Sequence, residues 1–125
     1  MNTKMYIGGQ LVAGEGSLVR VENPADGSII ESFQGASAEQ AEQALQAARK
    51  AFATWSKTSV DERIEWMLKF QAELYKDKDF LVELDSMETG KPFKNAVGDF
   101  EASARLLTFY GDEARRVFGT SIPDK

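Results

Sequence analysis

The chain has 125 residues, 42% of them hydrophobic, and its 15 Lys and Arg against 20 Asp and Glu give a net charge of −5. This length fits one modest domain with a core, while the acidic balance and the lack of a long apolar run argue against nucleic-acid partners and transmembrane helices. Neither Cys nor His occurs, which excludes disulfides, zinc–thiolate sites, thiol nucleophiles and a Ser-His-Asp triad.

The first 36 residues have the pattern of short strands separated by turns. Gly8-Gly9 suits a two-residue hairpin turn with positive φ. Asn23-Pro24-Ala25-Asp26-Gly27 predicts a second turn, because Pro24 presets φ and Gly27 tolerates the exit conformation. We therefore expect a small antiparallel sheet whose four strands span residues 4–7, 10–12, 18–22 and 28–34.

After residue 36 the apolar residues recur at helical spacing. Ser37 with Gln40, and Ser59 with Glu62, form capping boxes that open the first two helices. Asp79 can cap a third. The expected helices span residues 38–56, 60–77, 79–89 and 92–118. The predicted fold class is α+β, with strands in residues 1–36 and a helical layer in residues 37–118.

Local signals also place the end of the third helix and the extent of the fourth. Gly90 suits the left-handed residue that ends a helix, and Pro92 suits the first turn of the next. We expect the fourth helix to run to about Phe118, before Gly119 and Pro123. The apolar stripe of the second helix comprises Ile64, Met67, Leu68, Ala72 and Tyr75, broadened by Trp66, Phe70 and Leu74. The stripe of the fourth comprises Phe93, Ala96, Val97, Phe100, Ala104, Leu107, Tyr110 or Gly111, and Ala114.

Two short motifs look functional but have simpler interpretations. Gly14-Glu15-Gly16 begins like a dinucleotide-binding loop, yet it lacks the third glycine and lies between two predicted strands. A loose hairpin loop is the favoured interpretation. Arg115-Arg116 lies in the last turn of the fourth helix, where cations offset the helix dipole, and Asp112 and Glu113 nearby argue against a nucleic-acid patch.

The segment Glu88-Thr89-Gly90-Lys91-Pro92 carries more information. Locally it is a helix stop, a left-handed glycine and a helix start, but the same five residues resemble a hallmark of the aldehyde dehydrogenase superfamily. The resemblance extends from about Met5 to Lys125. It includes the turn Asn23–Gly27, Ala48 and Ala51-Phe52 with Trp55, Arg63, and Asp99 with Tyr110 and Ala114.

This resemblance implies an enzyme that oxidises an aldehyde to a carboxylic acid with NAD or NADP. In that family a cysteine attacks the carbonyl, hydride passes to the cofactor, and a glutamate activates water. Because this chain has no Cys, it resembles only the N-terminal part of the cofactor-binding domain, residues 1–125, of an enzyme with the α/β aldehyde dehydrogenase fold. We expect no catalytic or cofactor-binding residue, no bound cofactor and no activity in this chain alone.

The resemblance also points to two places that could touch function. Family members often hold a monovalent cation with backbone oxygens before the Asn-Pro turn and an acidic side chain before Thr-Gly-Lys. These positions correspond here to Val21, Glu22 and the metal candidate Glu88. The fourth helix lines part of the substrate entrance in relatives, which implies roles for Gly98 and Ala102, although small residues equally serve close helix packing.

Two interpretations of the whole chain stay open. One is an N-terminal aldehyde dehydrogenase segment, whose ending at Ile122–Lys125 in mid-connection favours truncation. The other is a stand-alone helical scaffold or interaction module without catalysis. In both cases the sequence predicts a cytoplasmic protein. Apolar surface left on the second and fourth helices predicts a chain that self-associates, swaps elements or stays only marginally folded, and we expect a homo-oligomer. The small aldehyde substrate belongs to the full-length enzyme only.

Overall fold

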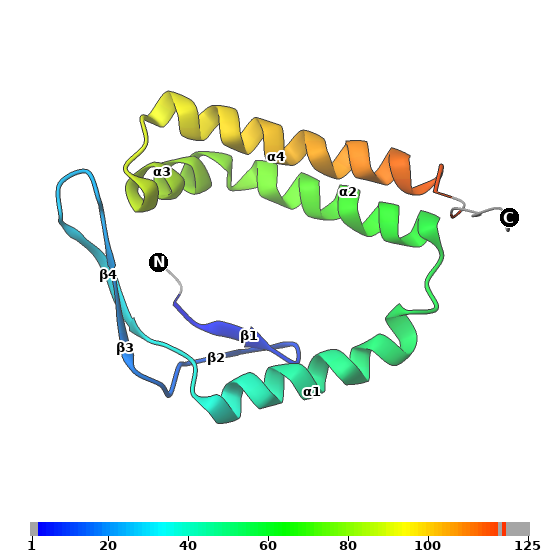
Figure 1. The fold of residues 1–125 in the computed structure, drawn as a ribbon, viewed down its shortest axis with the longest axis horizontal. Coiled ribbons are helices and arrows are strands. Elements are labelled where there is room, and N and C mark those ends of the chain that lie inside the picture. The colour runs from blue at the N-terminus through cyan, green and yellow to red at the C-terminus, as the bar shows by residue number, and fades with distance from the viewer. Residues whose placement is uncertain (1–2, 118, 120–125) are drawn as a thin grey trace, which may run out of the picture. The chain divides into compact units, whose positions relative to one another are not determined.

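The structure is a computed structural model that describes residues 3–117 and 119. Within these residues, four short strands precede four helices (Figure 1), as the sequence predicts. The chain divides into two compact units. The first comprises residues 1–57 and 87–91, the second comprises residues 58–86 and 92–125, and each unit is described by itself.

The strands form two antiparallel hairpins in the first unit. β1 (Met5–Ile7) pairs with β2 (Gln10–Val12) across the predicted glycine turn, and β3 (Leu18–Glu22) pairs with β4 (Ile29–Gln34). Antiparallel pairing is thus confirmed. Within the described residues, however, each hairpin is a two-stranded sheet of its own, whereas we expected one small sheet.

The connection from β2 to β3 is tightly packed. The prediction of a loose loop around Gly14 and Gly16 is therefore wrong. A Cβ atom added to Gly14 would lie 1.9 Å from the carbonyl oxygen of Gln34, and one added to Gly16 would lie 2.3 Å from that of Ala36. The backbone amide of Gly16 also donates to the Gly35 carbonyl at 2.8 Å. Both positions therefore require glycine because another backbone segment occupies the side-chain space.

The turn at residues 23–27 is confirmed. The Asn23 amide donates to the Ser28 carbonyl at 2.8 Å, and the Gly27 amide donates to the Asn23 carbonyl at 2.7 Å. Gly27 has a φ of 75°. The Ser28 hydroxyl donates to the Asp26 carboxylate at 2.6 Å, and this bond, together with the Ser28 amide, lowers the pKa of Asp26. The turn is thus closed by backbone and side-chain hydrogen bonds together.

The helices follow the sequence prediction closely. They are α1 (Ala38–Trp55), α2 (Val60–Lys76), α3 (Lys78–Thr89) and α4 (Phe93–Ala114). Both capping boxes are present. The Ser59 amide donates to the Glu62 carboxylate at 2.8 Å, and this bond is the main cause of the lowered pKa of Glu62.

Several helix ends differ from the prediction by one residue, and the end of α4 differs by about four. The α2 helix is capped at its C-terminus by Asp77, whose carbonyl accepts the Leu81 amide at 2.9 Å, so α3 begins before Asp79 and does not use it as a cap. The α4 helix ends at Ala114, where the Arg116 amide donates to the Glu113 carbonyl at 2.8 Å in a tighter turn. The prediction of a helix that continues to about residue 118 is therefore wrong, since residues 115–117 are not helical.

The core of the second unit lies where α2 packs along α4 (Figure 1). Ile64 is buried and would lie 3.5 Å from a Cβ atom on Gly111. Of the two alternatives in the predicted stripe of α4, Gly111 therefore faces the core, while Tyr110 is exposed. Ala96, Ala104 and Val82 are also buried. On α2 the contact face is Ile64, Met67, Gln71 and Leu74, while Leu68, Ala72 and Tyr75 from the predicted stripe are exposed.

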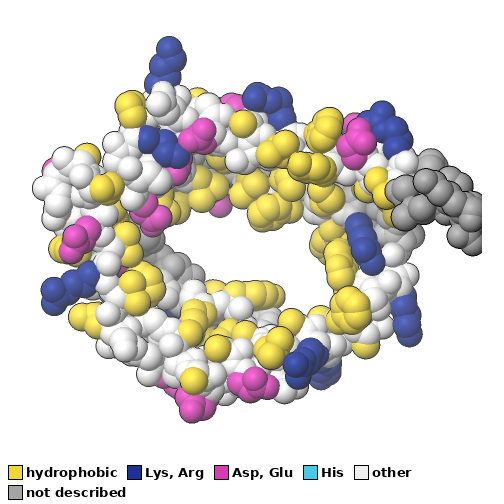
Figure 2. Space-filling view, in the orientation of Figure 1, with side chains coloured by type: hydrophobic (Ala, Val, Ile, Leu, Met, Phe, Trp, Pro, Cys, Tyr) yellow, Lys and Arg dark blue, Asp and Glu magenta, His cyan; other side chains and the backbone are white. Residues whose placement is uncertain are grey.

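Large apolar side chains remain exposed on both long helices of this unit, as predicted. Figure 2 shows hydrophobic side chains gathered over α2 and α4. The exposed set comprises Val60, Trp66, Leu68, Phe70, Tyr75, Phe93, Leu106, Phe109 and Tyr110. Among the described residues, no helix combines the length and apolar character needed to cross a membrane.

Candidate functional site

Two segments that carry the family resemblance meet in the first unit. Gly90 follows α3 with a φ of 68°, as predicted from its place after the helix. A Cβ atom at Gly90 would lie 2.9 Å from Pro24 Cγ and 3.2 Å from the Ala25 amide nitrogen. The glycine of the Glu88–Pro92 motif is therefore required twice, by its left-handed backbone and by its contact with the Asn23–Gly27 turn.

The cation candidate Glu88 lies in the last turn of α3, where its side chain is exposed. Val21 and Glu22 lie at the end of β3, directly before the turn that contacts Gly90. The three positions thus belong to the same unit. Nowhere in residues 3–117 or 119 do three or more metal-binding side chains form a group. Cation binding at Glu88 therefore stays a prediction.

The entrance candidates on α4 differ in their surroundings. Gly98 is exposed, and an added Cβ atom would have no described neighbour within 4 Å, so close helix packing does not explain this glycine. Ala102 lines a surface groove of about 670 Å³ in the second unit. We call this the α4 groove; its other lining residues are Gln71, Arg105, Leu106, Thr108, Phe109 and Asp112.

Gln71 lines the α4 groove, and the sequence analysis did not predict this role. Its side-chain amide donates to the Ala104 carbonyl at 2.5 Å and to the Thr108 hydroxyl at 3.0 Å. Gln71 lies four residues after Met67 and seven after Ile64, at helical spacing with the buried face. The only sign of this role in the sequence was a polar residue at a position that helical spacing places on the buried face of the helix.

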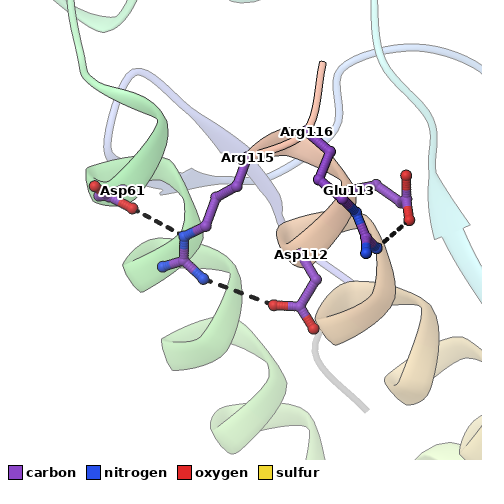
Figure 3. A network of polar contacts seen from close by, with 5 residues as sticks. All are labelled: Asp61, Asp112, Glu113, Arg115 and Arg116. Carbon is purple, nitrogen blue, oxygen red and sulfur yellow. Dashed lines mark hydrogen bonds and ion pairs between the residues drawn. The ribbon is translucent and has the colours of Figure 1, made fainter. Parts of the chain in front are cut away.

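A cluster of ion pairs lies beside Asp112, one of the residues that line the α4 groove. Arg115 contacts Asp61 at 3.1 Å and Asp112 at 3.6 Å (Figure 3). The Arg115 guanidinium contacts both carboxylates, so this group of three side chains carries one net negative charge. Arg116 pairs with Glu113, so the predicted basic pair consists of two arginines that both contact carboxylates.

A second cluster of polar side chains joins α2, α3 and α4 at Glu101. Lys78 donates to the Glu101 carboxylate at 2.6 Å, and the Tyr75 hydroxyl donates to the same carboxylate at 2.9 Å. The Lys78 bond is the first cause of the lowered pKa of Glu101, and Arg105 adds to it through its charge. Glu101 raises the pKa of both Tyr75 and Lys78 in return. Asp79 also acts on Lys78 through its charge, so two cations and two carboxylates balance in this cluster.

The lowered pKa of Glu101 predicts a specific acid dependence of stability. A carboxylate with a lowered folded-state pKa stabilises the fold above its ordinary value of 4.5 and loses this contribution as the pH falls through the folded-state pKa. We expect the melting temperature of the wild type to fall more steeply below about pH 5 than that of Glu101→Gln. Thermal unfolding followed by circular dichroism across this pH range measures both slopes.

Glu73→Gln is the matched control for this experiment. Glu73 forms an exposed ion pair with Lys76 at 2.6 Å, one turn away on the same helix, and exposed pairs of this type contribute little. The acid limb of Glu73→Gln should follow the wild type. Parallel curves for the wild type and Glu101→Gln would show that the Lys78–Glu101–Tyr75 cluster does not support the fold.

The structure also tests whether Gly14-Glu15-Gly16 fits a dinucleotide phosphate. Such a loop needs free amides that point at the anion. Here the Glu15 amide donates to the Gln40 side-chain oxygen at 3.0 Å, and the Gly16 amide donates to Gly35. The space beside both glycines is filled by backbone. These residues do not fit the phosphate group, in agreement with the sequence-based rejection of the motif.

Known proteins of one family resemble this chain in sequence. The sequence profile of the aldehyde dehydrogenase family matches residues 11–125. The chain is 38% identical over 122 residues to a malonate-semialdehyde dehydrogenase of Bacillus pumilus, covering 97% of this chain and 25% of the relative. It is 32% identical to a mitochondrial succinate-semialdehyde dehydrogenase of Arabidopsis thaliana, covering 98% of this chain and 24% of that protein.

Solved structures show the same relation. A NAD-dependent benzaldehyde dehydrogenase from Corynebacterium glutamicum matches with a TM-score of 0.86 and 28% identity, over 100% of this chain and 28% of that one. A NADP-dependent glyceraldehyde-3-phosphate dehydrogenase from Bacillus halodurans C-125 matches with a TM-score of 0.87 and 27% identity, over 98% and 26%. The chain spans about a quarter of the length of these proteins. It belongs to the aldehyde dehydrogenase family.

Proposed function

We propose that this chain is the N-terminal segment of an NAD- or NADP-dependent aldehyde dehydrogenase and that it has no dehydrogenase activity by itself. The observation that carries the proposal is the pattern of coverage. Nearly the whole chain aligns with its relatives, yet it spans only about a quarter of each. The missing Cys supports the second part, because a thiolate is the nucleophile that the family resemblance implies.

In this proposal the chain contributes shape and not reactive groups. The α4 groove forms one wall of the substrate entrance, with Gly98 and Ala102 on the same helix. The apolar lining from Leu106 and Phe109 suits the carbon skeleton of a small aldehyde. Nucleophile, general base and nucleotide-binding strands belong to other segments of the enzyme.

The names of several relatives suggest the substrate class. Malonate-, glutarate- and succinate-semialdehyde dehydrogenases occur among them, and each of these substrates carries a carboxylate as well as an aldehyde. We extend the proposal to a short aldehyde of this kind as the substrate of the full-length enzyme.

An activity assay tests the claim about the isolated chain. The purified 125-residue protein is incubated with NAD or NADP and a panel of short aldehydes and semialdehydes, and the absorbance of the reduced cofactor is followed. We expect no rate above a control without protein, while a complete aldehyde dehydrogenase added to the same mixture gives turnover. Turnover by the chain alone would overturn the proposal.

A further inference from the structure

The turn at residues 23–27 contains a dipeptide that the proposed function does not use. Asp26 is the only Asp or Asn in the sequence that is directly followed by glycine. Because glycine has no side chain, the backbone nitrogen of Gly27 is less shielded than that of other residues. Asp26 is exposed, and an added Cβ atom on Gly27 would have no described neighbour within 4 Å. Asp26-Gly27 is therefore the place in this chain where a side chain and the next backbone nitrogen can react most readily.

The reaction open to this dipeptide is a cyclisation of the backbone. The Gly27 nitrogen attacks Cγ of Asp26 and a carbon–nitrogen bond forms, while one carboxyl oxygen with its proton leaves as water together with the amide proton. The product is a five-membered succinimide ring. Water then opens this ring at one of its two carbonyl carbons. Opening at Cγ restores aspartate, whereas opening at the other carbonyl gives isoaspartate, whose main chain runs through the side-chain carbons.

Hydrogen bonds of the folded turn restrain both groups that would react. The Gly27 amide donates to the Asn23 carbonyl at 2.7 Å, and the nitrogen must release this bond before it can attack. The Asp26 carboxylate accepts from the Ser28 amide at 2.9 Å and from the Ser28 hydroxyl at 2.6 Å. Bonds to a charged acceptor are the stronger kind, so the carboxylate is held in one orientation.

The two bonds from Ser28 also keep the Asp26 carboxyl group ionised. They lower its pKa, with the Ser28 hydroxyl as the first cause and the Ser28 amide as the second. Hydrogen bonds to the charged form of a carboxyl group favour that form. The ionised group is the less reactive one, because the carbon of a carboxylate is a poorer electrophile than that of a carboxylic acid. Geometry and charge therefore act in the same direction.

We propose that Asp26-Gly27 is a site of spontaneous isoaspartate formation and that Ser28 suppresses the reaction in the folded chain by holding the Asp26 carboxylate. The reaction proceeds when the turn opens, since exposed turns open locally at a lower free energy than the whole fold. It uses only water from the solvent. This proposal does not rest on the dehydrogenase activity of the parent enzyme.

Isoaspartate would change the turn in which it forms. It adds one methylene group to the main chain between Asn23 and Ser28, and the amide–carbonyl bond of 2.8 Å between these two residues depends on the original spacing. The same turn places Pro24 against Gly90. The modification therefore reaches the Glu88–Pro92 motif through this contact.

Ageing of the purified chain allows the reaction to be measured at one site. Trypsin cleaves after Lys and Arg, so it releases residues 21–49 as one peptide, in which Asp26 is the only aspartate. The one asparagine in this peptide, Asn23, precedes proline, which has no amide proton to release. Succinimide and isoaspartate in the peptide therefore report on Asp26. Liquid chromatography with electron-transfer fragmentation measures both over several weeks at neutral pH.

The expected rates differ between the folded and the unfolded chain. The folded wild type should react at least about tenfold more slowly than the same chain in urea, because unfolding releases the bonds from Gly27 and Ser28. Under folding conditions, Ser28→Ala should react about fivefold faster than the wild type, since it removes one of the two bonds to the carboxylate. In urea the two chains should react at similar rates.

Ser32→Ala is the matched control for Ser28→Ala. Ser32 lies on β4 of the same hairpin, where it pairs with Arg20, and its side chain is exposed. The substitution makes the same chemical change outside the turn, so the rate at Asp26 should equal that of the wild type. Asp26→Glu should give no product in either solvent, because a longer side chain does not close a five-membered ring. Circular dichroism verifies that each variant is folded.

Three results would overturn the proposal. An unfolded wild type that forms no isoaspartate shows that the dipeptide is not reactive. Equal rates for the folded and the unfolded wild type show that the turn does not protect it, and this comparison needs no variant. Equal rates for folded wild type and folded Ser28→Ala show that Ser28 is not the protecting residue. None of these results affects the aldehyde dehydrogenase proposal, which the activity assay tests separately.

Discussion

Replacing Gly14 with alanine is expected to destabilise the chain by about 3 kcal/mol, the upper end of what overpacking costs. The added methyl group would lie 1.9 Å from the Gln34 carbonyl oxygen and 2.5 Å from the Gln34 carbonyl carbon. Both atoms belong to the backbone at the end of β4, so no side-chain rotation relieves the overlap. The strand end or the β2–β3 connection must move. Urea unfolding followed by far-ultraviolet circular dichroism measures the loss.

Gly98→Ala is the control for this prediction, because it makes the same chemical change in open space. Gly98 lies inside α4, and an added Cβ atom has no described neighbour within 4 Å. Alanine is favoured over glycine in an exposed helix by about 1 kcal/mol, so this variant should be more stable than the wild type. Equal effects of the two substitutions would contradict the tight connection at Gly14.

Replacing Gln40 with alanine should cost about 2–3 kcal/mol in the free energy of unfolding. Gln40 is 4% exposed, and its side-chain oxygen accepts from the amides of Glu15 and Ser37 at 3.0 and 3.1 Å. Its amide donates to the Ala13 carbonyl at 2.8 Å. Truncation leaves these backbone groups without their partner in a part-buried place, and unsatisfied groups of this kind are expensive. The same urea titration gives the value.

Gln43→Ala separates this effect from helix propensity. Gln43 lies three residues later on α1 with an exposed side chain, and alanine is the best helix former. We expect its stability to stay within about 0.5 kcal/mol of the wild type. A loss at Gln43 as large as that at Gln40 would mean that the hydrogen bonds to residues 13–15 do not anchor the β2–β3 connection.

The sequence predicted the elements of this fold because their signals are local. Ser37 with Gln40 and Ser59 with Glu62 lie three residues apart, and each box marks a helix start correctly. Gly90 likewise acts through its own backbone conformation, with a φ of 68°. The third helix is the exception: we expected Asp79 to cap it at 79, but the helix begins one residue earlier, at Lys78.

The features that sequence analysis missed depend on contacts between distant residues. The tightness of the loop at Gly14 comes from Gln34, twenty residues later, and nothing near Gly14 reveals that neighbour. Gln40 was predicted as a capping residue, which it is, but its bond to the Ala13 carbonyl joins residues 27 apart. The α4 groove needs α2 and α4 side by side before Gln71 meets Thr108. Pairing of this kind is decided by tertiary packing.

The family resemblance supplied what local physics could not. The segment Glu88–Pro92 is, by its own chemistry, only a helix stop followed by a helix start, and Gly90 in contact with Pro24 agrees with a structural role. Its assignment came from several motifs in order along the chain, and the family match over residues 11–125 confirms it. The roles of Glu88, Gly98 and Ala102 depend on protein segments that this chain does not contain, so they stay proposals.

The most direct test of the central proposal is the reading frame of the gene beyond the codon for Lys125. If the chain is the N-terminal segment of an aldehyde dehydrogenase, the frame continues for about three more lengths of this chain, because the chain covers 25% of a relative. It should encode nucleotide-binding strands with a glycine-rich turn and, later, a cysteine. A stop codon directly after Lys125, together with a stable 13.9 kDa product in the cell, would contradict the proposal and favour a scaffold without catalysis.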